Sequence, residues 1–387
     1  MHVPSLQSLF AAPAGLPAKS KDTEHPRRPI LSLTIPEPGD PATILGNRYL
    51  SKGDGAVLSS SSGMGKSAMA IQMALRWALE LDAFGIKPGR ALRILYVQSE
   101  DSDGDVAEVT ASIAHVLSLT PAQVAQINTN VLIVTDRTNR GQKFLHQLKL
   151  HIDAHKPDLV IINPLQAFID GDITAGQDLG AFLREGLNAL NHPAAFAYLL
   201  IHHTTKPATG KDRSERLWHE VMYDMAGGAE LINWARAILS LRATAVEGEF
   251  NLVLAKRGRR AGVVRMVEQG TGVRPEPVTT IPLKHSTGRL PSGLPIIYWE
   301  GREPSPEDEQ PAKKKGGRAP KYHFINFKGT LPKKTEPGKP YNQIAQTCKA
   351  NGVAPGSVYE LVQRWEADGD LEVIRPENGP ALYRAAL

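Results

Sequence analysis

The chain has 387 residues, 41% of them hydrophobic, which is enough for one large domain and a smaller one. Its formal net charge is +5, and residues 311–387 hold 13 Lys and Arg against 7 Asp and Glu, so the basic character belongs to the C-terminal end. A single cysteine, Cys348, excludes a disulfide framework and a cysteine-based zinc site. No apolar run approaches the roughly 20 residues of a membrane span, and the N-terminus lacks a secretory signal. We therefore expect a cytoplasmic protein with no membrane partner.

Composition divides the chain into four parts. Residues 1–40 are rich in Pro and Ser with little periodicity, which predicts a flexible arm. Residues 41–300 alternate short apolar runs with helical patterns and form the main domain. Residues 301–322 are charged, rich in Pro and Gly and almost free of apolar side chains, as in a basic linker. Residues 323–387 have the pattern of a small second domain.

The main domain is predicted to be α/β. Its short apolar runs are typical of strands, and several are too continuously apolar for a sheet with one wet face. We therefore expect a mostly parallel sheet with helices on both faces. The predicted strands are residues 56–60, 93–99, 131–136, 159–163, 196–203, 237–242 and 250–257.

The first of these strands leads into the segment SSSSGMGKSAMA, a Gly-rich turn that continues as an amphipathic helix. Such a turn surrounds phosphate groups with backbone N–H groups, with Lys66 neutralising the β- and γ-phosphates and Ser67 as a ligand of Mg²⁺. Ser60 stands where the motif usually has its first glycine, and a chance Gly-Lys-Ser at a helix start is the alternative. The predicted nucleotide-binding residues are Ser60, Ser61, Ser62, Gly63, Met64, Gly65, Lys66, Ser67 and Ala68.

Two later strands also end in residues suited to nucleotide chemistry. Glu100 follows the strand at 93–99, where ligands bind in open α/β folds, and could deprotonate an attacking water. The alternative for Glu100 is an acidic loop cap. His202 and His203 end the strand at 196–203, and His203 is the better candidate for a sensor of the γ-phosphate. Either histidine could instead be a hydrogen-bonded residue at the strand end.

The motifs follow one another along the chain as GMGKS, QSEDSDGD, LVIINPL, LLIHHTTKP, GGAELINWARAILSLR and LAKRGRR. This order resembles the RecA-fold ATPases of the RepA and DnaB hexameric helicase group, especially those of plasmids, phages and other mobile elements. The resemblance covers roughly residues 40–300. It implies a RecA-like P-loop NTPase fold, ATP and Mg²⁺ as cofactors, DNA as a partner and self-association into a ring, a hexamer in this group.

The resemblance also implies roles for individual residues. Glu100 would be the catalytic base. A basic residue would reach across to the phosphates bound by the neighbouring subunit and stabilise the transferring group. A different interpretation of the KRGRR segment is an exposed turn or a DNA-binding loop. The candidates for the basic residue acting across the interface are Arg236, Lys256, Arg257 and Arg259.

Asn163 stands where this group usually carries an aspartate that accepts hydrogen bonds from Mg²⁺-bound water. Asparagine keeps one acceptor oxygen but loses the charge, so we expect a weak metal contact through water and a lower metal affinity. Asp170 and Asp172 could compensate, although an Asp-Gly-Asp turn is their simpler role. Because the phosphate loop and the candidate base are retained, we still expect hydrolysis.

The C-terminal part is predicted to contain two helices followed by a β-hairpin, as in a winged helix. Ile344, Ala345 and Cys348 have the spacing of a short helix that ends at Asn-Gly. A second helix starts at Pro-Gly-Ser and places Val358, Leu361, Val362 and Trp365 on one face. Residues 371–375 and 381–387 would form the hairpin.

The opposite face of the second helix is polar and could meet a major groove or phosphate groups. Two lysines upstream of the first helix would add positive charge, although winged helices also mediate protein contacts. The predicted nucleic-acid-binding residues are Lys333, Lys334, Ser357, Tyr359, Gln363 and Arg364.

Together these patterns favour an ATP-hydrolysing ring protein that moves along or unwinds DNA in the replication of a mobile element. The alternative that Asn163 favours is a nucleotide-dependent DNA-binding switch, regulator or helicase loader with weak or no hydrolysis. A third is a RecA-like recombination ATPase, which should form filaments rather than closed rings.

Overall fold

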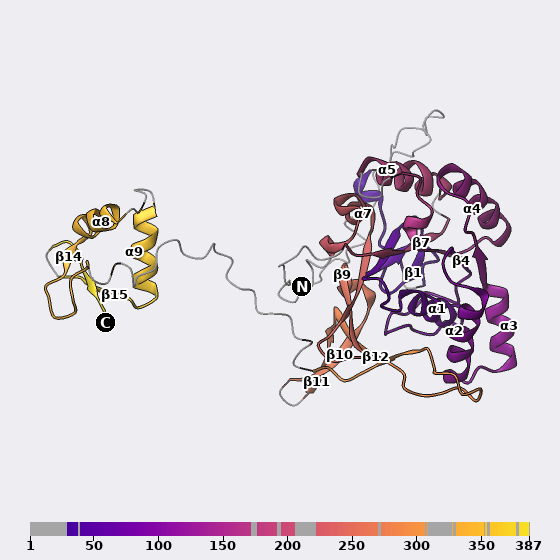
Figure 1. The fold of residues 1–387 in the computed structure, drawn as a ribbon. Helices are drawn as coiled ribbons and strands as arrows, with labels where there is room; N and C mark the ends of the chain where they lie inside the picture. The colour runs from indigo at the N-terminus through magenta and orange to yellow at the C-terminus, as the bar shows by residue number, and fades with distance from the viewer. Residues whose placement is uncertain are drawn as a thin grey trace, which may run out of the picture. The chain divides into compact units, whose positions relative to one another are not determined.

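The computed structural model divides the chain into two compact units, Met1–Pro311 and Ala312–Leu387 (Figure 1). The structure describes residues 29–37, 39–171, 176–191, 195–205, 222–269, 272–305, 308, 327, 330–351, 353, 357–376 and 379–386. Most of the predicted N-terminal arm and of the predicted linker lies outside these residues. None of the helices within the described ranges is long and apolar enough to cross a membrane.

The first unit is built on a large sheet whose strands have the order β13-β12-β9-β8-β3-β7-β6-β4-β5. The strands from β8 to β5 in this order are parallel, and β9, β12 and β13 continue the sheet in antiparallel fashion. The strands are β3 (Gly55–Ser60), β4 (Ile94–Gln98), β5 (Val131–Thr135), β6 (Leu159–Asn163), β7 (Ala197–His203), β8 (Ala237–Ala243), β9 (Glu249–Lys256), β12 (Thr280–His285) and β13 (Trp299–Gly301). The predicted α/β fold with a mostly parallel sheet is confirmed, and it is consistent with a RecA-like P-loop domain.

Helices cover both faces of the sheet, with α1, α2 and α3 on one side and α4, α5 and α7 on the other (Figure 1). Successive residues of a strand point to opposite faces, so Tyr96 packs in the first core and Val97 in the second. The helices are α1 (Lys66–Ala78), α2 (Asp103–Val116), α3 (Pro121–Asn130), α4 (Gly141–His155), α5 (Gly176–Ala181), α6 (Asn188–Leu190) and α7 (Gly228–Trp234).

Smaller elements complete the first unit. Two hairpins pair β1 (Thr43–Leu45) with β2 (Leu50–Ser51) and β10 (Val264–Gln269) with β11 (Gly272–Pro277). Short helical turns are η2 (Ile30–Ser32), η3 (Leu165–Ala167), the π-helical η4 (Phe182–Leu187) and η6 (Gly258–Ala261).

The turn between β3 and α1 is shaped by two glycines and by β13, the outermost antiparallel strand of the sheet. Gly63 and Gly65 have φ angles of 77° and 79°, in the left-handed region that favours glycine. A Cβ atom on Gly65 would lie 2.9 Å from the ring of Trp299, so a side chain there would also collide with β13. The side-chain amide of Gln72 on α1 fixes Trp299 by donating to its carbonyl and accepting from its N–H. Trp299 of β13 therefore packs against the turn and supports it.

The first unit extends beyond the predicted start of the linker at residue 301. Gly301 belongs to β13, and the guanidinium of Arg302 forms ion pairs with Glu249 at 3.1 Å and with Asp308 at 2.6 Å. The Arg302 side chain is only 7% exposed, because these carboxylates pair with it against β9. Its polar, Pro-rich surroundings in the sequence gave no sign of this packing, and the predicted boundary was therefore too early.

The second unit contains α8 (Tyr341–Ala350), α9 (Val358–Ala367) and a sheet of the order β14-β16-β15. The strands are β14 (Lys339–Pro340), β15 (Leu371–Ile374) and β16 (Leu382–Ala385). Both predicted helices and the predicted hairpin are present, and Leu361 and Trp365 are buried in the core as expected. The short strand β14 was not predicted, and Ser357 precedes α9 without capping it through its side chain. Whether this unit works as a winged helix remains a prediction.

Candidate functional site

A cavity of about 300 Å³ opens where β3, β4, β6 and β7 end at one edge of the sheet. The turn before α1 forms part of its wall. Four apolar side chains, Ile71, Val106, Val109 and Ile297, also line it, which suits the flat base of a nucleotide. The other lining residues are Ser62, Gly63, Met64, Gly65, Lys66, Ser67, Ala68, Glu100, Asp101, Asp105, Asn163 and His203.

Most of the predicted phosphate-binding residues line this cavity, but Ser60 and Ser61 do not. Ser60 is buried at the end of β3, where its hydroxyl donates to the carbonyl of Ser61 and accepts from Lys66. The hydroxyl of Ser61 lies 3.3 Å from that of Thr204. Ser60 has no positive φ angle, so this position accepts serine in place of glycine without backbone strain.

Lys66 is buried beneath the phosphate loop and makes no hydrogen bond to a carboxylate among the described residues. Its ammonium group donates to the Ser60 and Ser61 carbonyls at 3.2 and 2.8 Å. Burial lowers the pKa of Lys66 to about 8, and the charge of nearby Glu100 opposes this shift. A cation held among carbonyl oxygens in this way leaves room for an anionic partner such as a phosphate.

The two histidines at the end of β7 have different surroundings. The Nδ1 atom of His203 lies 3.2 Å from the Lys66 ammonium and accepts from it, so the proton of this imidazole belongs on Nε2. Burial and the Lys66 charge lower the pKa of His203, which favours the neutral form. His202 is buried, contacts the carbonyl of Ala226 through Nε2 at 2.8 Å, and has a pKa lowered by burial to about 4. The structure thus places His203, rather than His202, beside the phosphate loop.

Asn163 is buried at the end of β6 with its amide nitrogen toward the phosphate loop. Nδ2 donates to the Ser67 hydroxyl at 3.0 Å and to the Tyr96 hydroxyl at 2.9 Å. The sequence led us to expect that Asn163 would offer an acceptor oxygen toward the metal position. The observed side chain instead directs its N–H groups toward Ser67, because the hydroxyls of Ser67 and Tyr96 both accept hydrogen bonds from Nδ2.

Two carboxylates follow β4 at the rim of the cavity. Glu100 is exposed and also lines a second polar cavity with Asp136, Arg137 and Arg140, so a water molecule can reach it. Asp101 was missed by the sequence analysis, although its position directly after the candidate base was a usable signal. Of the residues proposed to compensate for Asn163, Asp170 is exposed beside Gly141 and does not line the cavity, and Asp172 lies outside the described residues.

Hard oxygen donors are what a magnesium ion requires, and the site offers them. Ser67, which carries a hydroxyl oxygen, lines the cavity. The Oδ2 atom of Asp101 is shielded from solvent and has no hydrogen bond of normal geometry among the described residues. Burial raises the pKa of Asp101, and the nearby Ser67 hydroxyl opposes this rise. The residues present therefore fit a divalent cation held together with nucleotide phosphates.

The basic residues predicted to act on phosphate lie at the opposite end of the strands from the phosphate loop, where β3 and β8 begin. The N–H of Arg236 donates to the carbonyl of Gly55, the first residue of β3, and Lys256 pairs with Ile238 near the start of β8. The length of β3 separates this edge from the phosphate loop by about 17 Å at roughly 3.3 Å per residue. Arg236 and Arg257 therefore do not reach the phosphate loop of their own chain.

These basic residues differ in how firmly they are held. The Lys256 ammonium donates to the carbonyls of Ile232 and Ala235 at the end of α7, and Arg257 donates to the Arg48 carbonyl. Arg236 and Arg257 both lie 3.7 Å from Asp54, yet the Arg236 side chain is 61% exposed and that of Arg257 only 22%. Arg259 is exposed. Arg236 and Arg259 are thus the candidates whose charge is exposed to solvent.

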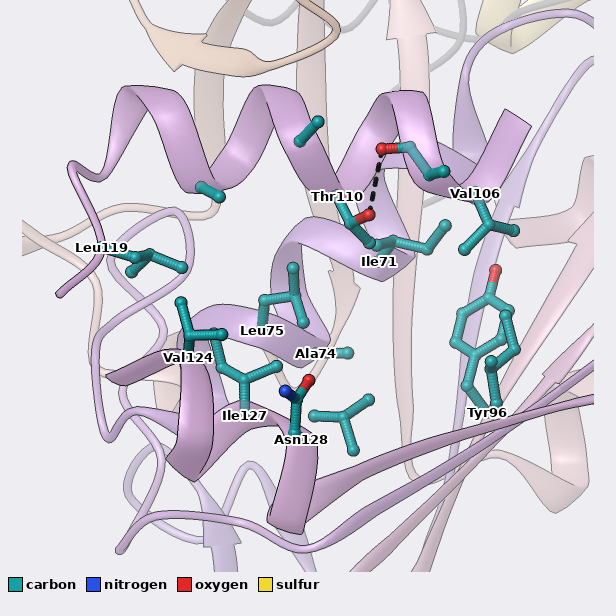
Figure 2. Close-up of a pocket in the computed structure, with 15 residues that line it drawn as sticks. Ile71, Ala74, Leu75, Tyr96, Val106, Thr110, Leu119, Val124, Ile127 and Asn128 are labelled. Atoms are coloured by element: carbon teal, nitrogen blue, oxygen red, sulfur yellow. Dashed lines mark hydrogen bonds between the residues drawn. The ribbon is translucent and has the colours of Figure 1, made fainter. Parts of the chain in front are cut away.

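A separate cavity of about 430 Å³ lies between α1, α2, α3 and β5 (Figure 2). Its walls are mainly aliphatic, with Ile71, Val124 and Ile127 among the side chains that line it. Tyr96 lines this cavity, and its hydroxyl accepts a hydrogen bond from Asn163, which lines the nucleotide cavity. Its polar side chains are those of Tyr96, Thr110 and Asn128, and none of its lining residues is Asp, Glu, His, Lys or Cys, so we assign it no catalytic role.

In the second unit, the predicted nucleic-acid-binding residues form part of the solvent-exposed surface. Exposed and buried side chains alternate along α9, so the helix has one face in the core and one face exposed to solvent. Exposed side chains are found at Lys333, Lys334, Ser357, Tyr359, Gln363 and Arg364. Contact with nucleic acid at these residues remains a prediction.

A family model described as an AAA domain matches residues 28–209, just under half of the chain. A search of curated proteins found no match. The matched range contains the phosphate loop and the residues at the ends of β4, β6 and β7. Together with the α/β fold, the match supports a P-loop ATPase domain that binds nucleotide.

The pKa of Lys66 predicts a pH dependence of nucleotide binding. Bound phosphates would raise this pKa above its value of about 8 in the free protein, so binding takes up a proton only when the pH exceeds 8. ADP affinity, measured by fluorescence titration, should be flat between about pH 7, where the phosphates are ionised, and pH 8. Above pH 8 it should fall by up to about tenfold per pH unit. In Lys66→Arg the fall should vanish, because guanidinium does not titrate there, and an equal fall in both proteins would contradict the assignment.

Proposed function

We propose that the protein is a ring-forming, RecA-like ATPase that couples ATP hydrolysis to movement on, or unwinding of, DNA in the replication of a mobile element. One observation carries this proposal. The phosphate loop and Glu100 share one edge of the sheet, while the basic residues suited to stabilise a phosphate lie at the opposite edge. A complete site then needs two copies of the chain, with the pocket of one facing the basic edge of the next.

Hydrolysis would proceed by attack of water in line with the bond that breaks. Glu100 accepts a proton as the water oxygen bonds to the γ-phosphorus, and the bond from that phosphorus to the β–γ bridging oxygen breaks to give ADP and phosphate. Lys66 neutralises charge on the phosphates from within the chain. A bound magnesium ion would neutralise further charge on the β- and γ-phosphates.

We propose that Arg236 contacts the phosphates bound by the neighbouring subunit and stabilises the group being transferred. It combines high exposure with only a long contact to Asp54, so its side chain can extend to a neighbour at little cost. His203 ends β7 beside the phosphate loop and would sense the γ-phosphate through its hydrogen bond to Lys66. The second unit would hold nucleic acid through α9 and the lysines before β14.

A nucleotide-dependent DNA-binding switch without turnover is the second candidate function. The observation that favours it is the neutral Asn163, whose amide hydrogens point at Ser67. The exposed Glu100 favours hydrolysis over this alternative, because a pure binding site has no use for a base at the rim.

Mixing two inactive variants tests whether the sites lie between subunits. Glu100→Gln removes the base and Arg236→Ala the charge supplied to the neighbour, so each should lower ATP turnover at least about a hundredfold. In an equal mixture, roughly a quarter of the interfaces combine an intact pocket with an intact Arg236, and turnover should return in that proportion. Pairing Glu100→Gln with Lys66→Ala, which spoil the same pocket, should restore nothing. No recovery in the first mixture would contradict sites shared between subunits.

The second unit predicts salt-dependent DNA binding. In the full chain, Lys333→Ala combined with Lys334→Ala should weaken binding to single-stranded DNA and reduce the slope of log affinity against log salt by about 1.4, because two phosphate contacts to a single strand are lost. Fluorescence anisotropy with a labelled oligonucleotide measures both quantities. Lys349→Ala, an exposed lysine at the end of α8, is the control and should leave the slope unchanged. Equal slopes for all proteins would show that DNA is bound elsewhere.

A further inference from the structure

The nucleotide pocket lacks a negative charge at the end of β6. Asn163 is neutral, buried and bonded through its amide hydrogens to Ser67 and Tyr96. A divalent cation beside the Ser67 hydroxyl would therefore meet N–H groups on that side. Positive charge must be balanced from another element, since the affinity of such a site for Mg²⁺ depends on carboxylate oxygens.

Asp101, in the loop after β4, also lies close to Ser67. Its Oδ2 atom is shielded from solvent without a hydrogen bond of normal geometry among the described residues, and a buried carboxylate oxygen without a partner is costly. The Ser67 hydroxyl is close enough to favour the charged form of this carboxyl, although burial raises its pKa. A cation at Ser67 would satisfy the unpaired oxygen.

The backbone of Asp101 is fixed from two directions. Its N–H donates to Gln98 Oε1 at 2.8 Å, and its carbonyl accepts from Gln98 Nε2 at 2.9 Å and from Arg137 at 3.0 Å. Gln98 is buried at the end of β4 and also donates to the Thr135 hydroxyl at 2.7 Å. These contacts fix the backbone of Asp101 before any ligand arrives.

The other carboxylates that line the described pocket have different surroundings. Asp105 accepts from the N–H and hydroxyl of Ser102 in the capping box of α2, and these bonds lower its pKa. Glu100 is exposed at the rim, where it meets solvent rather than Ser67. Asp101 is therefore the carboxylate best placed beside the Ser67 hydroxyl.

We propose that Asp101, together with Ser67, holds the divalent cation that accompanies the nucleotide, and that it supplies the charge that Asn163 does not. This assignment rests on the proposed nucleotide-binding function and adds the residue that makes a metal site possible in this chain. In this assignment the metal-binding carboxylate stands in the loop after β4, the strand that pairs with β6.

The test measures metal binding rather than turnover. Mn²⁺, which can be followed by electron paramagnetic resonance, is titrated into the full chain saturated with ADP. Asp101→Asn should weaken Mn²⁺ binding roughly 10- to 100-fold, while ADP affinity in EDTA stays equal or rises slightly because a negative charge is removed. Asp103→Asn removes the same charge from the exposed start of α2, outside the pocket lining, and should change Mn²⁺ binding less than about threefold.

A second variant keeps the test independent of folding. Asn163→Asp added to Asp101→Asn should restore most of the Mn²⁺ affinity, because the hydroxyls of Ser67 and Tyr96 can donate to the new carboxylate. Unchanged Mn²⁺ binding in Asp101→Asn, an equal loss in Asp103→Asn, or no recovery in the double variant would overturn the assignment. If the parent protein binds ADP neither with nor without metal, the proposed function itself falls, and this assignment falls with it.

Discussion

The buried ammonium of Lys66 determines what the pocket can hold. It is surrounded by the carbonyls of Ser60 and Ser61 and by the neutral ring of His203, and burial lowers its pKa. A cation in this setting is stabilised most by an anion that enters from the open side of the cavity. The glycine turn, the packing of Trp299 against it and the orientation of His203 all preserve this arrangement. Phosphate binding is the chemistry that follows from it.

The parallel sheet decides which groups can cooperate within one chain. Because β3, β4, β6 and β7 end at the same edge, the phosphate loop, Glu100, Asn163 and His203 converge although they are far apart in sequence. The same polarity carries Arg236 to the opposite edge, near the start of β3. A single chain thus contains both halves of the site that we propose, but cannot bring them together. Association of copies would then control hydrolysis, since the transition-state charge is balanced only at a correctly formed interface.

Much of the fold could be predicted from the sequence, because continuous apolar runs and a Gly-rich turn are local signals. The strands from β3 to β9 and both C-terminal helices follow from such patterns. The metal side of the site could not be predicted in the same way. Asn163 shows in the sequence that a charge is missing, but the distance of Asp170 from the pocket and the position of Asp101 beside Ser67 depend on loop geometry. Arg302 was assigned to the linker because its ion pairs with Glu249 and Asp308 depend on how the chain folds and leave no pattern in the sequence.

Steady-state ATP hydrolysis by the full chain, with and without single-stranded DNA, tests the central claim most directly. The proposed function requires magnesium-dependent turnover that rises when DNA is added and is lost in Glu100→Gln. Such a result would show that the pocket hydrolyses ATP even though Asn163 replaces the usual carboxylate. Nucleotide binding without turnover, unaltered by DNA and by Glu100→Gln, would contradict it and would identify the protein as a nucleotide-dependent switch.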